Sequence, residues 1–209
     1  MHVYFVRHGE TAQNRRHVHQ SPNTTLSPRG REAVMTTAEY LRGVNADLLV
    51  TSEYTRARES ARIIGMNIGL TPVTNGLYYE IIRPSALFEK SLFHPQTFWY
   101  VFLSVIHRKN SFWRYKDAEN VSDITERAKK ALRFLEAESE KHSSIIVVSH
   151  TVFINIMVAY LCKERMLDVR DLLGTFLHVE QTKNASVIHL EYNKNAGKNT
   201  CAWQRITDK

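Results

Sequence analysis

The 209-residue sequence contains only two cysteines, and it contains no uninterrupted apolar run of the length that a bilayer requires. Its first residues, MHVYFV, lack the basic start and the long apolar segment of a secretion signal. Cys162 and Cys201 lie far apart without metal-ligand spacing, so we expect ordinary packing residues and no disulfide framework. Together these absences predict a cytoplasmic protein without membrane contact.

A concentrated basic segment is also missing, although the formal net charge is +7 and the pI is near 9.5. The arginines and lysines are scattered, without the basic arm or reading motif of a nucleic-acid-binding protein. The positive charge therefore predicts a small phosphorylated substrate or a phosphoprotein as partner, and no nucleic acid. With 43% hydrophobic and 23% charged residues, the chain is expected to form a single globular domain over residues 1–209.

Strands and helices alternate along most of the chain. Three short apolar runs, VYFV, DLLVTS and SIIVVS, predict buried strands, and TPVTNGLYYE predicts a further extended segment. The segments ASVIHLEY and TCAWQRI predict a hairpin at one edge of the sheet. This order predicts an α/β fold: a three-layer αβα sandwich with a mostly parallel sheet.

The helices between these strands have recognisable boundaries. One is expected to begin with Ser27 as N-cap and to end at Gly43, and the next to end at Gly65. VSDITERAKKALRFLEAESEKH predicts a long amphipathic helix, and a last helix is expected to begin near Thr151.

Three of the predicted strands end in polar residues: VRH, VTS and VSH. An unpaired buried charge is costly, so Arg7 and His8 must meet either an anion or water. In open α/β sheets the ligand crevice lies outside the carboxyl ends of the strands, where His8 and His150 would converge. Two structural histidines in loops are the alternative, but the accompanying arginines favour an anion-binding site.

RHGETAQN, residues 7–14, resembles the signature of the histidine phosphatase superfamily, which includes the cofactor-dependent phosphoglycerate mutases and many small phosphatases. The resemblance continues in family order through LSPRGREA, SEYTRARESA, YYEI, VVSH and NASVIHLEY, so it spans most of the chain. A bare RHG triplet is common by chance, whereas six ordered segments are specific. The match implies a phosphoglycerate mutase-like fold of the small phosphatase branch, with a helical cap inserted at about residues 83–117.

The resemblance implies phosphoryl transfer through a phosphohistidine, with His8 as nucleophile. Neighbouring guanidinium groups lower the pKa of an imidazole and keep it neutral. Arg7 and Arg56 match the arginines that hold the phosphate, for which their planar forks are suited. Asn14 matches a position that donates to the phosphate. Arg58, two residues further along the predicted helix, is expected to face elsewhere.

His150 matches the second catalytic histidine, which donates to the phosphoryl oxygens and stabilises their charge. The sequence departs from the family where Thr151 replaces the usual glycine and where Ser21 stands in the first loop. If Thr151 opens a helix, its backbone N–H still binds an anion. We therefore expect Thr151 to contact the substrate and to narrow specificity or lower the rate.

Glu80, in LYYEIIRPS, matches the acid that protonates the leaving alcohol. A free glutamate has a pKa near ~4.3 and would be ionised. Aromatic burial and the charge of the substrate must therefore hold the proton, with Tyr78 and Tyr79 as the expected aromatic neighbours. The alternative is a surface carboxylate paired with Arg83.

The aromatic-rich segment from Phe88 to Tyr115 is interpreted as the cap. Pro95 lies near the start of its predicted helix, and most of its aromatic side chains are expected to form the core of the cap. The candidates to line the pocket are Phe98, Trp113 and Tyr115, and the candidates to bind a second anionic group of the substrate are Arg83, His107 and Arg108.

The preferred function is thus a phosphomonoester hydrolase of the metal-independent histidine acid phosphatase type, without a cofactor. A phosphoglycerate mutase is the first alternative, but the chain is shorter than the usual mutase and lacks its long cap. A non-catalytic module that binds phosphorylated ligands is the second, because of Thr151. His17 and His19 form an HVH pair without an acidic or cysteine companion, so we expect no metal site.

Overall fold

The computed structural model describes residues 1–161, 183–197 and 200–206. Its centre is a six-stranded sheet in the order β3-β2-β4-β1-β5-β6. The pairs β1–β4, β2–β4 and β2–β3 are parallel, whereas β1–β5 and β5–β6 are antiparallel. The strands are β1 (His2–Arg7), β2 (Leu48–Thr51), β3 (Val73–Thr74), β4 (Ser144–Ser149), β5 (Val187–Tyr192) and β6 (Trp203–Ile206).

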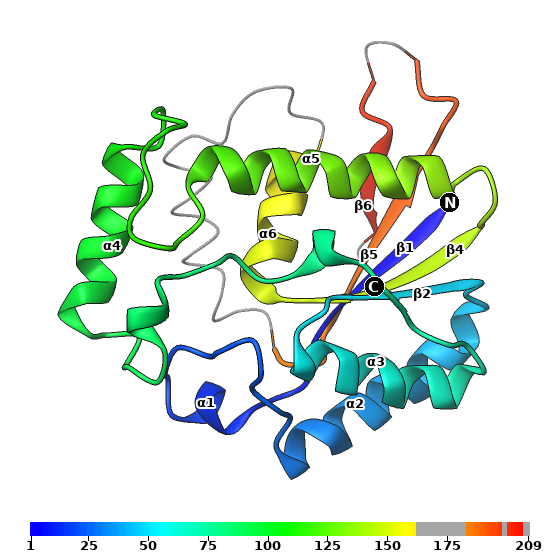
Figure 1. Ribbon diagram of the computed structural model, residues 1–209. Coiled ribbons are helices and arrows are strands. Elements are labelled where there is room, and N and C mark those ends of the chain that lie inside the picture. The colour runs from blue at the N-terminus through cyan, green and yellow to red at the C-terminus, as the bar shows by residue number, and fades with distance from the viewer. Residues whose placement is uncertain (162–182, 198–199, 207–209) are drawn as a thin grey trace.

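Helices cover both faces of this sheet, which confirms the αβα sandwich, and one further helix lies apart at an end of the molecule (Figure 1). α5 (Val121–Glu138) and α6 (Thr151–Tyr160) pack on one face, and α2 (Pro28–Leu41) and α3 (Thr55–Ile68) on the other. The helix at the end is α4 (Pro95–Ile106). The short helices are α1 (Ala12–Arg15) and the 3₁₀ turns η1 (Arg42–Val44), η2 (Gly76–Tyr78) and η3 (Ser85–Leu87).

The two faces of the sheet follow from the alternation of side chains along its strands. Val3 and Phe5 of β1 join the core beneath α5 and α6, whereas Tyr4 and Val6 join the core beneath α2 and α3. Because successive side chains of a strand point to opposite faces, an uninterrupted apolar run is needed where both faces are covered. The predicted edge hairpin, β5 and β6, is also confirmed.

Helix starts agree with the sequence better than helix ends. Ser27 caps α2 by accepting from the backbone of Gly30 at 3.0 Å, as predicted. α2 ends at Leu41 rather than Gly43. α3 continues past Gly65 to Ile68, and its C-cap Gly69 has the left-handed φ of 76°. Gly65 serves close packing instead, because a Cβ there would lie 2.3 Å from the carbonyl oxygen of Leu70.

The segment between Thr71 and Glu80 is less extended than predicted. Only Val73 and Thr74 pair with β2, and a 3₁₀ turn follows at Gly76–Tyr78. Tyr78 is buried and donates its hydroxyl to the carbonyl of Ala131 at 3.0 Å. The chain thus leaves the sheet early and turns under α5, since the phenol is anchored there.

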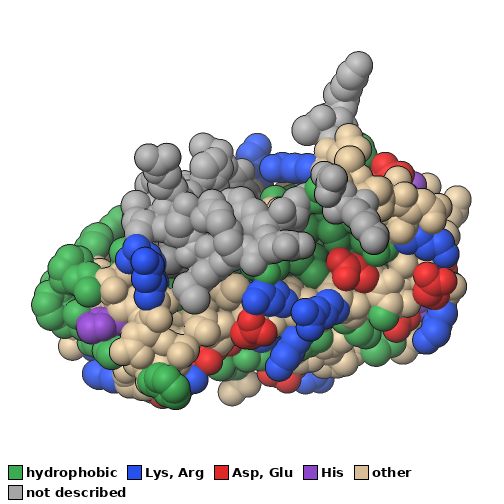
Figure 2. All heavy atoms as spheres, turned by 90° about the horizontal axis from the view of Figure 1, so that it is seen from above, with side chains coloured by type: hydrophobic (Ala, Val, Ile, Leu, Met, Phe, Trp, Pro, Cys, Tyr) green, Lys and Arg blue, Asp and Glu red, His purple; other side chains and the backbone are tan. Residues whose placement is uncertain are grey.

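The α4 helix is present where the sequence predicts it, but the expectation that its aromatics form a cap core is wrong. Tyr100 is buried, whereas Trp99 and Phe102 are 55% and 52% exposed. Phe98, a candidate to line the pocket, is 60% exposed. Figure 2 shows hydrophobic side chains gathered at the end of the molecule where α4 lies. Helical spacing identifies which residues share a face, but it does not say whether another element covers that face. The cap and domain boundaries stay predictions.

Two further expectations concern cysteine and membranes. Cys201 is disulfide-bonded, so the prediction of an ordinary packing residue is wrong, and the cysteines no longer support the prediction of a cytoplasmic protein. Cys162 lies outside the described residues. Of the helices that the structure describes, none has the length and apolar character needed to traverse a bilayer.

Candidate active site

β1 and β4 are parallel neighbours in the sheet, and a histidine follows the carboxyl end of each strand. Arg7 pairs in register with Ser149, so a histidine follows each strand at the same level. The centroids of the His8 and His150 rings are 5.1 Å apart, and both side chains are buried. The predicted convergence of the two strand ends is therefore confirmed.

The hydrogen bonds of His8 fix its tautomer. The Nε–H of Arg56 points at Nε2 of His8 at 3.2 Å, and a guanidinium can only donate. Nε2 therefore carries a lone pair, and the proton is on Nδ1, which donates to the carbonyl oxygen of Gly9 at 2.7 Å. Burial, then the charges of Arg56 and Arg7, lower the pKa of His8 well below its usual value of 6.5. The ring is therefore neutral at near-neutral pH, with a lone pair on Nε2.

Two arginines surround this imidazole. Arg56, in the first turn of α3, is buried and also donates from Nη1 to the carbonyl oxygen of Ser21 at 2.9 Å. Burial lowers the pKa of both Arg7 and Arg56 to about 10, partly offset by the charge of Glu80, so both remain cationic at neutral pH. Arg58 is exposed, as predicted. The structure thus brings together the two arginines expected to hold a phosphate.

His150 retains an unused ring nitrogen. Its Nε2 lies 2.8 Å from the hydroxyl of Ser52, and its buried Nδ1 has no hydrogen-bond partner among the described residues. Burial, then Arg56 and His8, lower the pKa of His150 well below 6.5. The edge of the Tyr54 ring, 5.2 Å away by centroids, also packs against it. An orphaned buried nitrogen beside His8 is placed to meet a ligand oxygen.

Glu80 lies at the N-terminus of α6. Its carboxylate accepts from the backbone N–H groups of Ile81 at 3.0 Å, Phe153 at 3.1 Å and Val152 at 3.3 Å. The predicted aromatic setting is wrong in detail, because Tyr78 points under α5 and Tyr79 donates its hydroxyl to Glu119 at 3.2 Å. Within the described chain no ion pair joins Glu80 to Arg83, so the surface-pair alternative is not supported.

A buried ion pair that the sequence analysis missed holds the segment carrying Glu80. Arg127 of α5 donates two hydrogen bonds to Glu119, at 2.9 and 2.8 Å, and one to the carbonyl oxygen of Tyr79 at 2.7 Å. Glu119 in turn accepts from the backbone of Ile82 at 2.9 Å. The guanidinium also lies over the ring of Phe153, 4.1 Å from its centroid. The pair therefore braces both the Glu80 segment and the start of α6.

Two further predicted substrate contacts, Asn14 and Thr151, differ in how far the structure engages them. The Oδ1 atom of Asn14 accepts from the backbone and hydroxyl of Thr11, both at 3.1 Å, which leaves only its amide NH₂ to face a ligand. Thr151 begins α6, as predicted, and is buried. The backbone N–H groups of Val152 and Phe153 bind Glu80. The buried hydroxyl of Thr151 itself has no hydrogen-bond partner among the described residues, so its contact with a substrate stays a prediction.

Sequence reasoning also missed three supporting side chains. Ser52 contacts His150, and Tyr54 lies under the Arg56 guanidinium, 5.1 Å from the ring centroid. Ser60 accepts from the backbone of Gly9 at 3.0 Å and so ties α3 to the loop after β1. The polar end of the VTS strand was a signal for Ser52, but nothing in the local sequence distinguishes Ser60.

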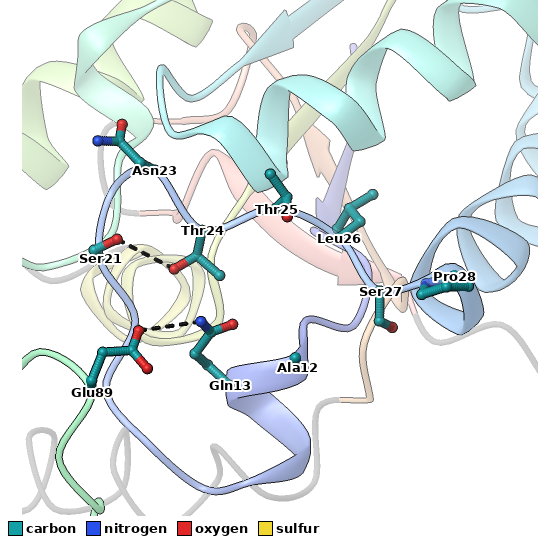
Figure 3. Close-up of a pocket in the computed structure, with 10 residues that line it drawn as sticks. All are labelled: Ala12, Gln13, Ser21, Asn23, Thr24, Thr25, Leu26, Ser27, Pro28 and Glu89. Carbon is teal, nitrogen blue, oxygen red and sulfur yellow. Dashed lines mark hydrogen bonds between the residues drawn. The ribbon is translucent and has the colours of Figure 1, made fainter.

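A cavity of about 440 Å³ is lined by the loop from Ser21 to Pro28, by the start of α1 and by Glu89 (Figure 3). Hydroxyl and amide groups line much of it, and its wall includes hydrogen bonds from Gln13 to Glu89 and between Ser21 and Thr24. Ser21 connects the cavity to the catalytic centre, because its carbonyl oxygen accepts from Arg56. That bond uses backbone, so it does not depend on the serine side chain.

The predicted pocket aromatics and the HVH pair are dispersed. Phe98 is exposed, Trp113 stacks on His107 with centroids 4.4 Å apart, and Tyr115 packs near Tyr100. His17 packs on Phe93, while His19 points between Arg83 and Thr97. In the described ranges no group of three or more histidine, cysteine or acidic side chains is arranged to hold a metal ion.

A family model described as the histidine phosphatase superfamily, branch 1, matches residues 3–203 of the chain. None of the curated protein sequences matches it. The family match covers all the residues discussed above, including both histidines, the two arginines and Glu80.

Several solved structures share the fold at low sequence identity. A mycobacterial glucosyl-3-phosphoglycerate phosphatase in complex with VO₃ is 22% identical with a TM-score of 0.71, covering 98% of this chain and 96% of that one. A putative α-ribazole-5′-P phosphatase from Escherichia coli is 20% identical with a TM-score of 0.72, covering 93% and 91%. A phosphoserine phosphatase mutant from Entamoeba histolytica is 15% identical with a TM-score of 0.73, covering 99% and 95%.

Proposed function

Because the chain belongs to the histidine phosphatase superfamily, branch 1, we propose that it hydrolyses phosphomonoesters through a phosphohistidine formed on Nε2 of His8. The observation that carries the proposal is the tautomer of His8: a neutral ring whose lone pair faces Arg56, with its proton held by Gly9. Phosphatase names among proteins of similar fold support the reaction class. The substrate is a small phosphorylated molecule.

In the first step, Nε2 of His8 attacks phosphorus and the bond from phosphorus to the ester oxygen breaks. Arg7 and Arg56 hold the phosphoryl oxygens and offset their charge. Nδ1 of His150, when it carries the ring proton, donates to one of these oxygens. Glu80 gives its proton to the leaving alcohol, which departs neutral.

In the second step, water attacks the phosphohistidine. The carboxylate of Glu80 accepts a proton from the water, the N–P bond breaks, and His8 regains its lone pair. Inorganic phosphate leaves, and Glu80 is again protonated for the next cycle. A phosphoglycerate mutase would instead pass the phosphoryl group to a bound phosphorylated intermediate.

The test is hydrolysis of p-nitrophenyl phosphate by the purified protein and by His8→Ala. We expect turnover that His8→Ala abolishes, that vanadate inhibits and that survives a chelator. His17→Ala, at an exposed histidine of the first loop, is the matched control and should retain activity. Brief mixing with ³²P-labelled substrate should yield an acid-labile, base-stable phosphoprotein in the wild type alone.

Three results would each overturn part of this proposal. Turnover that persists in His8→Ala would show that His8 is not the nucleophile. Complete loss of activity with a chelator would show that the reaction needs a metal ion. Conversion of 3-phosphoglycerate to its isomer without phosphate release would show a mutase.

A further inference from the structure

The structure distinguishes among the three side chains, Arg83, His107 and Arg108, that were candidates to bind a second anionic group. His107 is stacked on Trp113, and Arg108 donates from Nη1 to the carbonyl oxygen of Val105 at 3.0 Å. Both are therefore engaged within the cap. Arg83 is different, because it follows Glu80 by three residues and points back to the first loop, where its Nη1 lies 3.3 Å from Nδ1 of His19.

The partner of Arg83 is a neutral group. A guanidinium only donates, so Nδ1 of His19 accepts and Nε2 carries the proton, which it donates to the hydroxyl of Thr97 at 2.9 Å. His19 is 2% exposed, and burial, then Arg83 and His94, lower its pKa to about 4. The hydrogen bonds from Arg83 to His19 and from His19 to Thr97 therefore orient the guanidinium without offsetting its positive charge.

Among the residues that the structure describes, Arg83 is thus a half-buried cation without a carboxylate partner. Over residues 1–161, 183–197 and 200–206, no aspartate or glutamate forms an ion pair with it. The contrast within the site is Arg127, whose guanidinium is matched by Glu119 at 2.8 Å. Removing a cation partly from water without a counter-ion is unfavourable unless a ligand supplies one.

The first loop joins Arg83 to the phosphate-binding centre. Two residues beyond His19, the carbonyl oxygen of Ser21 accepts from Arg56. The same loop is fixed to the cap, because the backbone of His19 donates to Lys90 at 2.9 Å and accepts from Glu89 at 3.0 Å. The positive charge of Arg83 also reaches Arg56, whose pKa it lowers. Arg83 therefore occupies a defined position beside the phosphate clamp.

We infer that Arg83, oriented by His19 and Thr97, forms a subsite for a second anionic group, and that the substrates are phosphomonoesters that carry one. The inference rests on the proposed function and names its substrate class. A carboxylate or a second phosphate fits, since both bind a guanidinium through two parallel hydrogen bonds.

The experiment compares 3-phosphoglycerate with glycerol 3-phosphate, which carries a CH₂OH group in place of the carboxylate. Inhibition constants are measured for both as competitors of p-nitrophenyl phosphate hydrolysis. We expect the wild type to bind 3-phosphoglycerate at least about tenfold more tightly, the effect of a charge-assisted hydrogen-bond pair. Glycerol 1,3-bisphosphate, which presents a phosphate at that end, shows which anion the subsite favours.

Arg83→Gln should remove the preference and leave the affinity for glycerol 3-phosphate unchanged. Arg83→Lys keeps the charge without the planar fork, so it should retain part of the preference even if the glutamine variant folds poorly. Arg108→Gln is the matched control on the cap and should retain the whole preference. Equal affinities in the wild type, or a preference that survives in Arg83→Gln, would overturn the inference.

Failure of the inference and failure of the proposed function give different results. Titration calorimetry of the same ligands against His8→Ala measures binding without turnover. If p-nitrophenyl phosphate is not hydrolysed, the proposed function fails, and the calorimetric preference alone decides whether the subsite exists. If it is hydrolysed and calorimetry shows no preference, the phosphatase stands and the subsite does not.

Discussion

At the scale of single residues, the guanidinium of Arg56 lies against Nε2 of His8, where a phosphoryl group would bind in the proposed mechanism. Its Nε–H points at the lone pair of His8 at 3.2 Å, while its Nη1 is held by the carbonyl of Ser21. In the proposed mechanism, an incoming phosphoryl group displaces the first contact and can keep the second. The guanidinium is therefore pre-oriented on the loop and released from the nucleophile only when a phosphate oxygen replaces the imidazole as its acceptor.

Arg56→Gln should lower kcat/KM by about 100-fold or more, as for loss of a donor to the developing charge. It should also raise the pKa of His8, because Arg56 is the largest charged neighbour that lowers it. The acidic limb of the pH profile of kcat/KM should therefore move to higher pH. Arg58→Gln, two residues along and exposed, is the control for both readouts. An acidic limb that stays in place would show that burial alone sets this pKa.

The sequence could predict where the candidate reacting groups lie but not which groups hold them in place. His8, Arg7 and His150 follow apolar strands at the end where ligands bind, so their places could be inferred from pattern. Ser60 and Arg127 act on parts of the chain far away in sequence, on Gly9 and on Tyr79. Such contacts depend on how helices pack on the sheet, and no local pattern encodes them.

At the scale of elements, the loop after β1 is pressed against the start of α2. A Cβ added to Gly30 would lie 2.1 Å from the carbonyl oxygen of Glu10, and one added to Gly9 would lie 2.6 Å from the carbonyl of Gly30. Backbone cannot yield here without displacing His8, which is followed directly by Gly9. The two glycines thus let a helix and the catalytic loop touch.

Gly30→Ala should destabilise the protein by about 2 kcal/mol or more, although alanine favours a helix, because the methyl group meets backbone rather than a mobile side chain. It should also lower kcat by displacing the loop. Gly43→Ala, where a Cβ would meet nothing within 4 Å, should change the unfolding free energy by less than about 0.5 kcal/mol. Urea unfolding of both variants measures this. A stable, fully active Gly30→Ala would refute the close packing.

Arg127→Gln should have two separable effects. Breaking the pair leaves Glu119 buried and unpaired, which should cost about 3–5 kcal/mol of unfolding free energy, and Arg127→Gln/Glu119→Gln should recover part of it. Loosening the Glu80 segment should slow hydrolysis of β-glycerol phosphate more than that of p-nitrophenyl phosphate, whose alcohol leaves without a proton. An equal loss on both substrates would indicate that Arg127 acts on stability alone.

The α4 helix shows where pattern-based prediction stops. Its start at Pro95 and its helical character follow from residue types, and His94 caps it by accepting from the backbone of Gln96 at 3.2 Å. The assignment of its aromatics to a core failed because it assumed a covering element. The spacing of apolar residues predicts which side chains share one face of a helix. Whether that face is exposed depends on which other elements pack against it.

At the scale of the whole molecule, three histidines of the described part of the chain are buried in a protein that carries a formal net charge of +7. The pKa values of His8 and His150 lie well below 6.5, chiefly because of burial, and that of His19 is about 4. All three are thus neutral in the folded state where the unfolded chain already binds protons. The burial that keeps His8 neutral should therefore also make the unfolding free energy fall in acid.

The unfolding free energy should be highest above pH 6.5 and should fall as the pH is lowered towards 4. Over this range the unfolded state binds more protons than the folded state, so stability rises with pH. Each buried histidine contributes up to about 1.4 kcal/mol per pH unit. Urea unfolding at pH 7.5, 6.0 and 5.0 measures the slope, and His19→Gln should reduce it by about one proton.

Activity should then be limited by folding rather than by protonation of the nucleophile as the pH falls below 6.5. Because the low pKa of His8 keeps Nε2 available in the folded state, kcat/KM per folded molecule should stay constant while the folded fraction declines. Parallel measurements of activity and circular dichroism from pH 7.5 to 4.5 test this. A decline in kcat/KM with the folded fraction intact would place the His8 pKa near its ordinary value, and Nε2 would then be protonated in the range where hydrolysis is expected.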